Sequence, residues 1–275
     1  MKYRPNMRKK KIKVALAGLG FGGAFVPIYA KHPDVESLVL VDNDEECLNR
    51  IGDMYLLGNR MNSLDDVIRD DSIDAVHLVT PIPLHAEQAI RVLKAGKHCA
   101  CTVPAATSMA DLRAIVKAQK DSKKNYMMME TAVYTREFLN IQELYRKGVL
   151  GKIQLLRGCH YQDMEHWPKY WDGLPPMWYG THALAPLLAI ARTRAIAVHC
   201  FGSGTMREGL RKQYRNPFPV ETAIFRLEGS PAAMEVTRTL FHTARLYQEG
   251  FDVYGEKGTY EWVVGSEEHF LQKRG

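Results

Sequence analysis

The chain has 275 residues, 46% of them hydrophobic, which allows one large domain or two medium domains with a full core. No apolar run reaches the ~18–20 residues of a membrane-spanning helix, so no membrane partner is expected. The formal net charge is +6, but a basic N-terminal run holds much of it and no aromatic-interleaved basic patch follows, so no nucleic-acid partner is predicted.

The many lysine and arginine residues in residues 1–13 predict that this segment is a basic, flexible tail. The tail lacks the apolar segment and the small-residue cleavage site of a secretory signal. The five cysteines are an odd number without CxxC spacing, which favours reduced thiols over a disulfide framework. We therefore expect a cytoplasmic protein. The positive charge outside the tail suits an anionic cofactor or substrate.

The first half alternates short apolar strands with helices. Strands are predicted over Ile12–Ala17, Leu38–Val41, Ala75–Val79, His98–Thr102 and Tyr126–Met129. Helices are predicted over His85–Ala95 and Met109–Ser122, the second after the N-cap candidates Thr107 and Ser108. The alternation indicates βαβ units and a parallel sheet, and thus an α/β Rossmann domain over residues 14–125.

From about Gly151 the pattern changes to longer, often alternating strand-like segments. These segments are Lys152–Tyr161, Ala195–Phe201, Glu221–Glu228, Ala232–Leu240 and Gly250–Tyr254. Hairpin-like turns at residues 228–231 and 255–258 separate some of them. The one clear helix candidate is Ala183–Ala191. Residues 126–275 therefore predict an α+β domain with a largely antiparallel sheet.

A glycine-rich turn follows the first strand and opens a helix. Its residues are Gly18, Leu19, Gly20, Phe21, Gly22 and Gly23. Asp42 closes the second strand about 20 residues later, where a dinucleotide fingerprint has its acid. Glycines let the backbone approach a diphosphate, and a carboxylate accepts hydrogen bonds from ribose while repelling a 2′-phosphate. The pattern predicts NAD rather than NADP, with Pro27 shortening or kinking the helix.

Further motifs occur along the chain in a fixed order. They are Ala17-Gly18-Leu19-Gly20, Val79-Thr80-Pro81 followed by His85, Gly96-Lys97-His98, Pro104, and Tyr179-Gly180-Thr181-His182. The combination resembles the Gfo/Idh/MocA family of oxidoreductases. The resemblance implies a Rossmann domain followed by an α+β domain with a large, mostly antiparallel open sheet. It also implies NAD, a sugar or polyol substrate, and a homo-dimer or tetramer built through the second-domain sheet.

The resemblance also assigns roles to single residues. It implies that His182 is the catalytic acid or base and that a set of residues lies beside the cofactor. That set is Thr80, Pro81, His85, Val103 and Pro104. Members of the family are normally longer, so the chain is either a compact version or lacks a C-terminal part.

Two positions depart from the family pattern. Thr102-Val103-Pro104 stands where the family has Glu-Lys-Pro, and Trp178 stands where it often has Asp. Valine cannot move a proton, which puts the usual dehydrogenase mechanism in doubt. Motifs around Val103, Glu130 and His182 look like the NAD-dependent α-N-acetylgalactosaminidase branch of the family. That resemblance implies transient oxidation of the sugar at C3 without net redox change.

Three residues are candidates for the chemistry. The imidazole of His182 titrates near neutral pH and can take a hydroxyl proton, although it could also be a packed or capping histidine. Tyr179 could share a proton network with it or be a packed aromatic. Glu130 follows a parallel strand, where ligands bind, and could act as an acid or base or start a helix. Tyr134, close behind, is a candidate substrate contact.

An aromatic and polar segment over residues 161–172 precedes the His182 region. Aromatic faces suit sugar rings and polar side chains suit hydroxyl groups, so Gln162, Asp163 and Trp167 are predicted to contact substrate. The alternative is an ordinary packed loop. His160 and His166 with Asp163 imitate a metal set, but strand alternation separates them and no metal is predicted.

Three functions remain open from the sequence. The first is an NAD-dependent oxidoreductase that transfers hydride between a sugar or polyol carbon and nicotinamide, with His182 as acid or base. The second is an NAD-using glycoside hydrolase with transient C3 oxidation. The third is a non-catalytic, NAD-sensing regulatory protein.

Overall fold

The computed structural model describes residues 10–165, 167, 171, 175–241, 247–262 and 269–273. The chain divides into two compact units, Met1–Met129 and Glu130–Gly275. Each unit has its own sheet and its own hydrophobic core. Among the described helices, none combines the length and apolar character that crossing a membrane requires.

The first unit contains a parallel sheet with the strand order β3-β2-β1-β4-β5-β6. The strands are β1 (Ile12–Ala17), β2 (Val35–Val41), β3 (Arg60–Met61), β4 (Ala75–Leu78), β5 (His98–Thr102) and β6 (Tyr126–Met129). This is the doubly wound order of a Rossmann fold, which confirms the predicted fold class. Because β6 pairs with β5, the first unit runs to Met129 rather than ending at residue 125.

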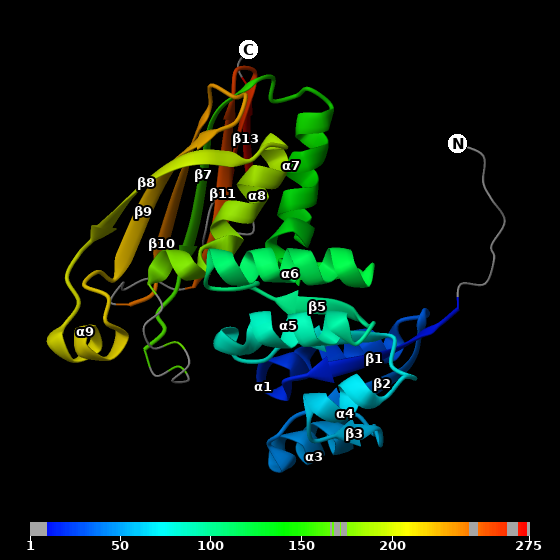
Figure 1. Ribbon diagram of the computed structural model, residues 1–275. Coiled ribbons are helices and arrows are strands. Elements are labelled where there is room, and N and C mark those ends of the chain that lie inside the picture. Colours follow the sequence, from blue (N-terminus) through cyan, green and yellow to red (C-terminus); the bar gives the residue numbers. More distant parts are fainter. Residues whose placement is uncertain are drawn as a thin grey trace, which may run out of the picture. The chain divides into compact units, whose positions relative to one another are not determined.

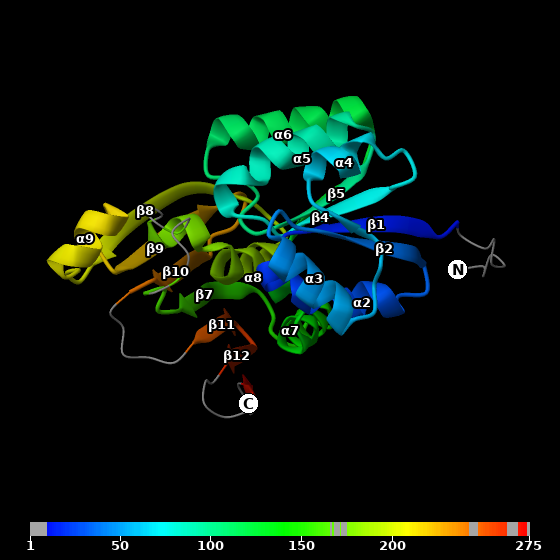
Figure 2. The same cartoon turned by 90° about the horizontal axis from the view of Figure 1, so that it is seen from below.

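Helices flank this sheet on both sides. They are α1 (Leu19–Gly22), α2 (Val26–Lys31), α3 (Glu45–Met54), α4 (Leu64–Arg69), α5 (His85–Lys94) and α6 (Met109–Ser122). Figure 2 shows α4, α5 and α6 on one side of the strands and α2 and α3 on the other. Ser108 caps α6, since its hydroxyl accepts from Asp111 N at 3.0 Å. The first helix is broken by a 3₁₀ turn (Gly23–Phe25), and Pro27 lies in the first turn of α2, as its fixed φ favours.

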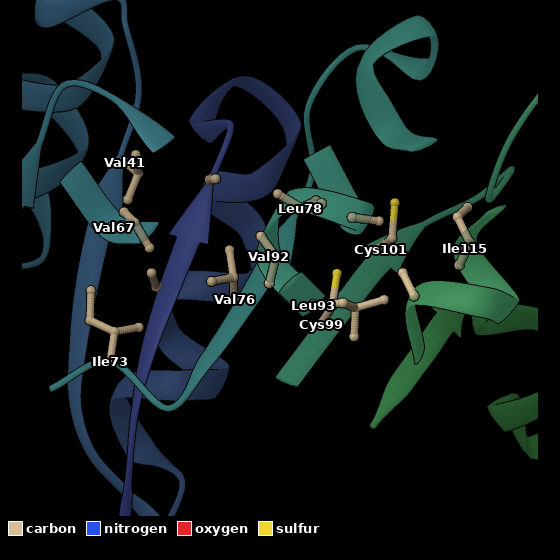
Figure 3. Packing of buried hydrophobic residues seen from close by; sticks show 14 of the residues in the cluster. Val41, Val67, Ile73, Val76, Leu78, Val92, Leu93, Cys99, Cys101 and Ile115 are labelled. Atoms are coloured by element: carbon tan, nitrogen blue, oxygen red, sulfur yellow. The ribbon is translucent and has the colours of Figure 1, made fainter. Parts of the chain in front are cut away.

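Strand alternation divides the core of this unit between the two faces of the sheet. On β1, Val14 and Leu16 face α1, α2 and α3, whereas Ala15 and Ala17 face the opposite layer. Figure 3 shows that opposite layer, in which apolar side chains of the strands pack against α4, α5 and α6. Cys99 and Cys101 belong to this layer and are buried, as expected of small core residues.

The second unit contains a mostly antiparallel sheet with the order β13-β12-β11-β7-β10-β9-β8. The strands are β7 (Ile153–Tyr161), β8 (Ala195–Ser203), β9 (Val220–Leu227), β10 (Ala233–Thr239), β11 (Gln248–Gly255), β12 (Gly258–Trp262) and β13 (His269–Lys273). Only β7 and β10 pair in parallel among these strands. The two predicted hairpin turns join β9 to β10 and β11 to β12.

The helices of the second unit are α7 (Arg136–Arg146), α8 (Thr181–Ala191) and α9 (Glu208–Tyr214), with 3₁₀ turns η3 (Thr131–Tyr134) and η5 (Pro176–Tyr179), in the described residues. The expectation of a single clear helix was wrong. The start of α7 had a sequence signal, because Thr135 caps it through Phe138 N. Helices α7 and α8 cover one face of the sheet (Figure 1), and their apolar side chains form the core of the unit.

Candidate active site

The turn after β1 begins with Gly18, which adopts φ +91° directly before α1. A Cβ atom at this position would lie 2.5 Å from the carbonyl oxygen of Val79. A residue with a side chain rarely adopts this conformation and could not approach Val79 so closely. Gly18 therefore lets the chain turn sharply where β1 and β4 end side by side, the switch point at which doubly wound sheets bind ligands.

The other glycines of the turn differ in what surrounds them. A Cβ on Gly20 would meet no atom within 4 Å, whereas one on Gly22 would lie 3.2 Å from the Val79 side chain and one on Gly23 3.1 Å from that of Ile51. Gly22 and Gly23 thus permit close packing, and the open side of Gly20 leaves the backbone accessible to a diphosphate. The turn fits the NAD that its sequence predicts.

Asp42 follows β2, and its carboxylate holds two backbone N–H groups. Leu19 N donates to Oδ2 at 2.7 Å, and Asp44 N donates to Oδ1 at 3.0 Å. Asp42 therefore ties the glycine turn to the end of β2, a role that the sequence analysis did not foresee. Each carboxylate oxygen has a second lone pair, so the contact with ribose stays a prediction.

His85 joins the chain segments that follow β4 and β5. Its Nε2 lies 2.7 Å from Thr80 O, and its Nδ1 lies 2.8 Å from Pro104 O. Burial lowers the pKa of His85, and these two hydrogen bonds oppose the shift. Pro81 starts the next turn, and Val103 is buried beside Pro104. His85 thus acts on these two segments as a positioning residue, and their contact with NAD stays a prediction.

In the second unit, Glu130 and His182 form a buried pair. Glu130 directly precedes η3, and its Oε1 accepts from Ala132 N at 3.0 Å. The same oxygen lies 2.5 Å from His182 Nδ1, and both side chains are at least nine-tenths buried. Because a carboxylate only accepts, Nδ1 carries the proton in this contact. The structure thus has Glu130 as a turn-start carboxylate, one of its two predicted alternatives, and also as the partner of His182, which the sequence analysis did not foresee.

Tyr179 lies on the other side of the His182 ring. Its hydroxyl is 3.3 Å from His182 Nε2, and the two rings meet edge to face. With Nδ1 protonated, a neutral His182 keeps a lone pair on Nε2 that faces the Tyr179 hydroxyl. The arrangement is that of a general base oriented by a carboxylate. The three predicted catalytic residues therefore lie together.

Arg238 is a buried residue of this region that the sequence analysis missed. Its guanidinium donates to Tyr179 O at 2.9 Å, His160 O at 3.1 Å and Gln162 Oε1 at 2.9 Å. Burial lowers the pKa of Arg238 to about 9, so it stays charged at neutral pH. Strand alternation places Arg238 on the same face as Met234 and Val236, and a charge on an apolar face was the signal available in the sequence.

Two further side chains near His182 were not assigned to its chemistry. The His160 ring lies 5.2 Å from the His182 ring, and its pKa is lowered by burial, by Arg238 and by His182. Glu249 Oε1 lies 3.9 Å from His182 Nε2. His160 is therefore a neutral neighbour of the site, and Glu249 adds a carboxylate to it.

Of the four predicted substrate residues, two are linked by contacts to the His182 region and two are not. Gln162 joins the site through Arg238, and Trp167 meets Trp171, whose ring lies 4.7 Å from that of Tyr179. Asp163 is exposed and accepts from Glu165 N, and Tyr134 is 61% exposed. Within the described residues, no interaction joins Asp163 or Tyr134 to His182. Their contact with substrate stays a prediction.

Trp178, in the place of the family's acid, is 48% exposed. His166, considered above as a metal ligand, lies outside the described residues. Among the side chains that are described, no three His, Cys, Asp or Glu residues lie close enough together to hold a metal ion.

The strand order, the glycine turn and the buried carboxylate–histidine–tyrosine arrangement define the class of a Rossmann-type, NAD-binding oxidoreductase fold with a second sheet domain. Residues 12–130 match the family model GFO_IDH_MocA, described as an oxidoreductase family with an NAD-binding Rossmann fold. The first unit of the chain is thus similar to the Gfo/Idh/MocA family, as the sequence predicts, and the prediction of an NAD-binding Rossmann domain is confirmed.

A curated relative is the glycosyl hydrolase family 109 protein of Shewanella baltica (strain OS155). It is 29% identical over 198 residues, which cover 64% of this chain and 43% of the relative. The match thus spans less than half the length of that relative.

Two solved structures share the fold across both units. The aldose-aldose oxidoreductase of Caulobacter crescentus, complexed with glycerol, has a TM-score of 0.79 at 21% identity. The match covers 96% of this chain and 81% of that chain. The WlbA dehydrogenase of Bordetella pertussis, in complex with NADH and UDP-GlcNAcA, has a TM-score of 0.75 at 22% identity, with 93% of this chain and 74% of that chain covered. At these identities the similarity shows the fold.

Proposed function

We propose that this protein is an NAD-dependent enzyme that acts on a hydroxyl-bearing carbon of a sugar or polyol, with His182 as the acid or base. The observation that supports this function best is the contact of 2.5 Å between Glu130 Oε1 and His182 Nδ1. It favours the tautomer in which Nε2 carries the lone pair that can take a proton. When bound, NAD accepts a hydride from such a carbon and can return it.

In this proposal each residue of the site has a separate task. His182 Nε2 takes the hydroxyl proton, and Glu130 stabilises the imidazolium that forms. The Tyr179 hydroxyl donates to the developing alkoxide, and Arg238 holds the Tyr179 backbone in place through its carbonyl oxygen. Val103 cannot transfer a proton as the family's lysine does, so His182 must perform this transfer.

The test of this function is NADH formation by the NAD-loaded protein with a panel of aldoses, amino sugars and inositols. We expect turnover with the wild type and at least a ~100-fold loss in His182→Ala. His32→Ala is the control, since His32 is an exposed histidine outside the unit that holds His182. Absence of NADH with every compound, from protein that binds NAD, would contradict net oxidation. If protein that binds NAD but forms no NADH bound a partner in response to NAD, this result would support the third function, a non-catalytic regulatory sensor.

A second candidate is an NAD-using glycoside hydrolase with no net redox change. Two observations favour it: Val103 in place of the family's lysine, and the similarity to the glycosyl hydrolase family 109 protein. Transient oxidation at C3 would acidify the C2 proton, and removing that proton also requires a base such as His182. Release of nitrophenol from aryl α-glycosides, with deuterium from solvent entering at C2, would separate this reaction from net oxidation. Hydrolysis without deuterium at C2 would exclude it.

We also propose that copies of the chain associate through the second sheet. Helices α7 and α8 cover one face of that sheet, and the opposite face presents Phe201 and Ile224, which are 70% and 53% exposed. The register places both side chains on that opposite face, since Phe201 pairs with Thr222 and His199 with Ile224. Exposed apolar side chains on a continuous sheet favour association with an equivalent surface.

A further inference from the structure

Glu249, on β11, is a second carboxylate beside the proposed catalytic histidine. Its Oε1 lies 3.9 Å from His182 Nε2 and 3.8 Å from His160 Nε2, and the Tyr247 hydroxyl donates a hydrogen bond to the same oxygen. Side chains alternate along a strand, so Gln248 and Gly250 line a groove of about 430 Å³ on the opposite face. Glu249 therefore belongs to the face that carries His182.

The distance between Glu249 and His182 allows both side chains to contact one substrate oxygen. A distance of 3.9 Å is too long for a direct hydrogen bond, but an oxygen atom to one side of the line between the two atoms could lie about 2.8 Å from each. The Glu249 side chain is 19% exposed, so it is not sealed in the core. A substrate hydroxyl at His182 Nε2 would thus lie next to the Glu249 carboxylate.

The charge of this site is opposite in sign to that of the whole chain. Glu130 and Glu249 bring two carboxylates to the surroundings of His182, and Arg238 brings one guanidinium, which leaves an excess of one negative charge among the described groups. A carboxylate accepts hydrogen bonds from hydroxyl and ammonium groups and repels other anions. The formal charge of +6 therefore does not describe what this site would bind.

We propose that Glu249 determines the substrate class of this site. It accepts a hydrogen bond from a hydroxyl or ammonium group adjacent to the carbon that His182 serves, and its charge disfavours sugars that carry a carboxylate or phosphate. The site thus takes neutral sugars, amino sugars or polyols rather than uronates or sugar phosphates. This inference rests on the proposed function, because it places the substrate hydroxyl at His182 Nε2.

The test compares binding of three sugars with the same ring and different charge, without requiring turnover. D-Glucose, D-glucosamine and D-glucuronate are mixed with NAD-loaded protein, and saturation-transfer NMR measures their relative binding. The wild type is expected to bind the neutral and the amino sugar in preference to the uronate. In Glu249→Gln the ratio of glucosamine to glucuronate is expected to fall about ten-fold, the scale of one charge-assisted hydrogen bond.

Glu256→Gln is the matched control, because Glu256 is an exposed acid in the turn that follows β11. It is expected to keep the wild-type ratio. The inference is overturned if the wild type binds the uronate as well as the neutral sugar, if Glu249→Gln leaves the ratio unchanged, or if no sugar binds. Charge selectivity without NADH formation or nitrophenol release would instead contradict the proposed function and leave the role of Glu249 intact.

Discussion

Glu130 Oε1 lies 2.5 Å from His182 Nδ1, although 52 residues separate the two side chains in the sequence. Glu130 directly follows β6, and His182 lies in the first turn of α8. The contact therefore brings together a residue that begins the second unit and one from its central helix. A helix N-terminus disfavours a positive charge, and the Glu130 carboxylate would oppose this effect when His182 takes a proton in the proposed reaction.

Replacing Glu130 with glutamine tests this relationship. An amide can donate its own hydrogen atoms, so it no longer fixes the His182 tautomer or stabilises the imidazolium. We expect kcat to fall by about 10²- to 10⁴-fold, with NAD affinity little changed. Steady-state kinetics and NAD fluorescence titration measure the two quantities. Glu143→Gln, at a partly exposed acid on α7, should leave both unchanged. Full activity in Glu130→Gln would show that His182 works without its carboxylate.

The first unit could be predicted closely because its information is local. Short apolar strands, the Ser108 cap and the glycine turn each act within a few residues, and the structure has them where the sequence placed them. The second unit depends more on pairing between distant strands. Alternation located β7 to β11 but not β12 and β13, and the parallel pairing of β7 with β10 follows from tertiary packing that no local pattern encodes.

The candidate site shows the same division. His182, Tyr179 and Glu130 were predicted from residue type, motif and position after a strand. Arg238 and Glu249 were missed because their contacts are with residues far away in the sequence. Arg238 donates to the carbonyl oxygens of Tyr179 and His160, and Glu249 lies near His182. A buried arginine bonded to carbonyl groups has no short sequence motif.

The glycine turn allows a paired test of folding and cofactor binding. Gly18→Ala should lower stability by at least ~1–2 kcal/mol, because φ is +91° and the new Cβ would lie 2.5 Å from Val79 O. Gly20→Ala should keep the melting temperature, since its Cβ meets nothing within 4 Å, and should weaken NAD binding roughly ten-fold by filling the diphosphate space. Calorimetry of both variants and NAD titration of Gly20→Ala measure these effects. Unchanged NAD affinity in Gly20→Ala would show that the diphosphate does not bind next to Gly20.

The proposed association of copies predicts an effect of charge on the open sheet face. Phe201→Glu places a carboxylate on that face, where a partner copy would bury it without a counter-ion. We expect the oligomer to dissociate to monomer in light scattering coupled to size exclusion, with secondary structure retained. Leu139→Glu, an exposed apolar position on α7, is the control and should not change the mass. A wild type that is monomeric at high concentration would contradict the proposal.

His77 predicts how the stability of the first unit depends on pH. Its ring is 1% exposed on β4, Nδ1 lies 3.0 Å from Tyr29 OH, and burial lowers its pKa from 6.5 to about 4. The unfolded chain therefore binds a proton between pH 6.5 and 4 that the folded chain does not. The stabilising contribution is complete above pH 6.5 and is lost as pH falls toward 4, by about 3 kcal/mol in total.

Urea unfolding followed at pH 7.5 and at pH 5 measures about 2 kcal/mol of this loss, since pH 5 lies 1.5 units below 6.5. His77→Gln should reduce it, because an amide keeps an acceptor for Tyr29 and does not titrate. His32→Gln, at an exposed histidine of the same unit, should leave the pH dependence of the wild type unchanged. If His77→Gln lost stability on acidification as steeply as the wild type, the acid sensitivity would have to come from other buried groups. His160 is the first of these, because burial lowers its pKa in the same direction.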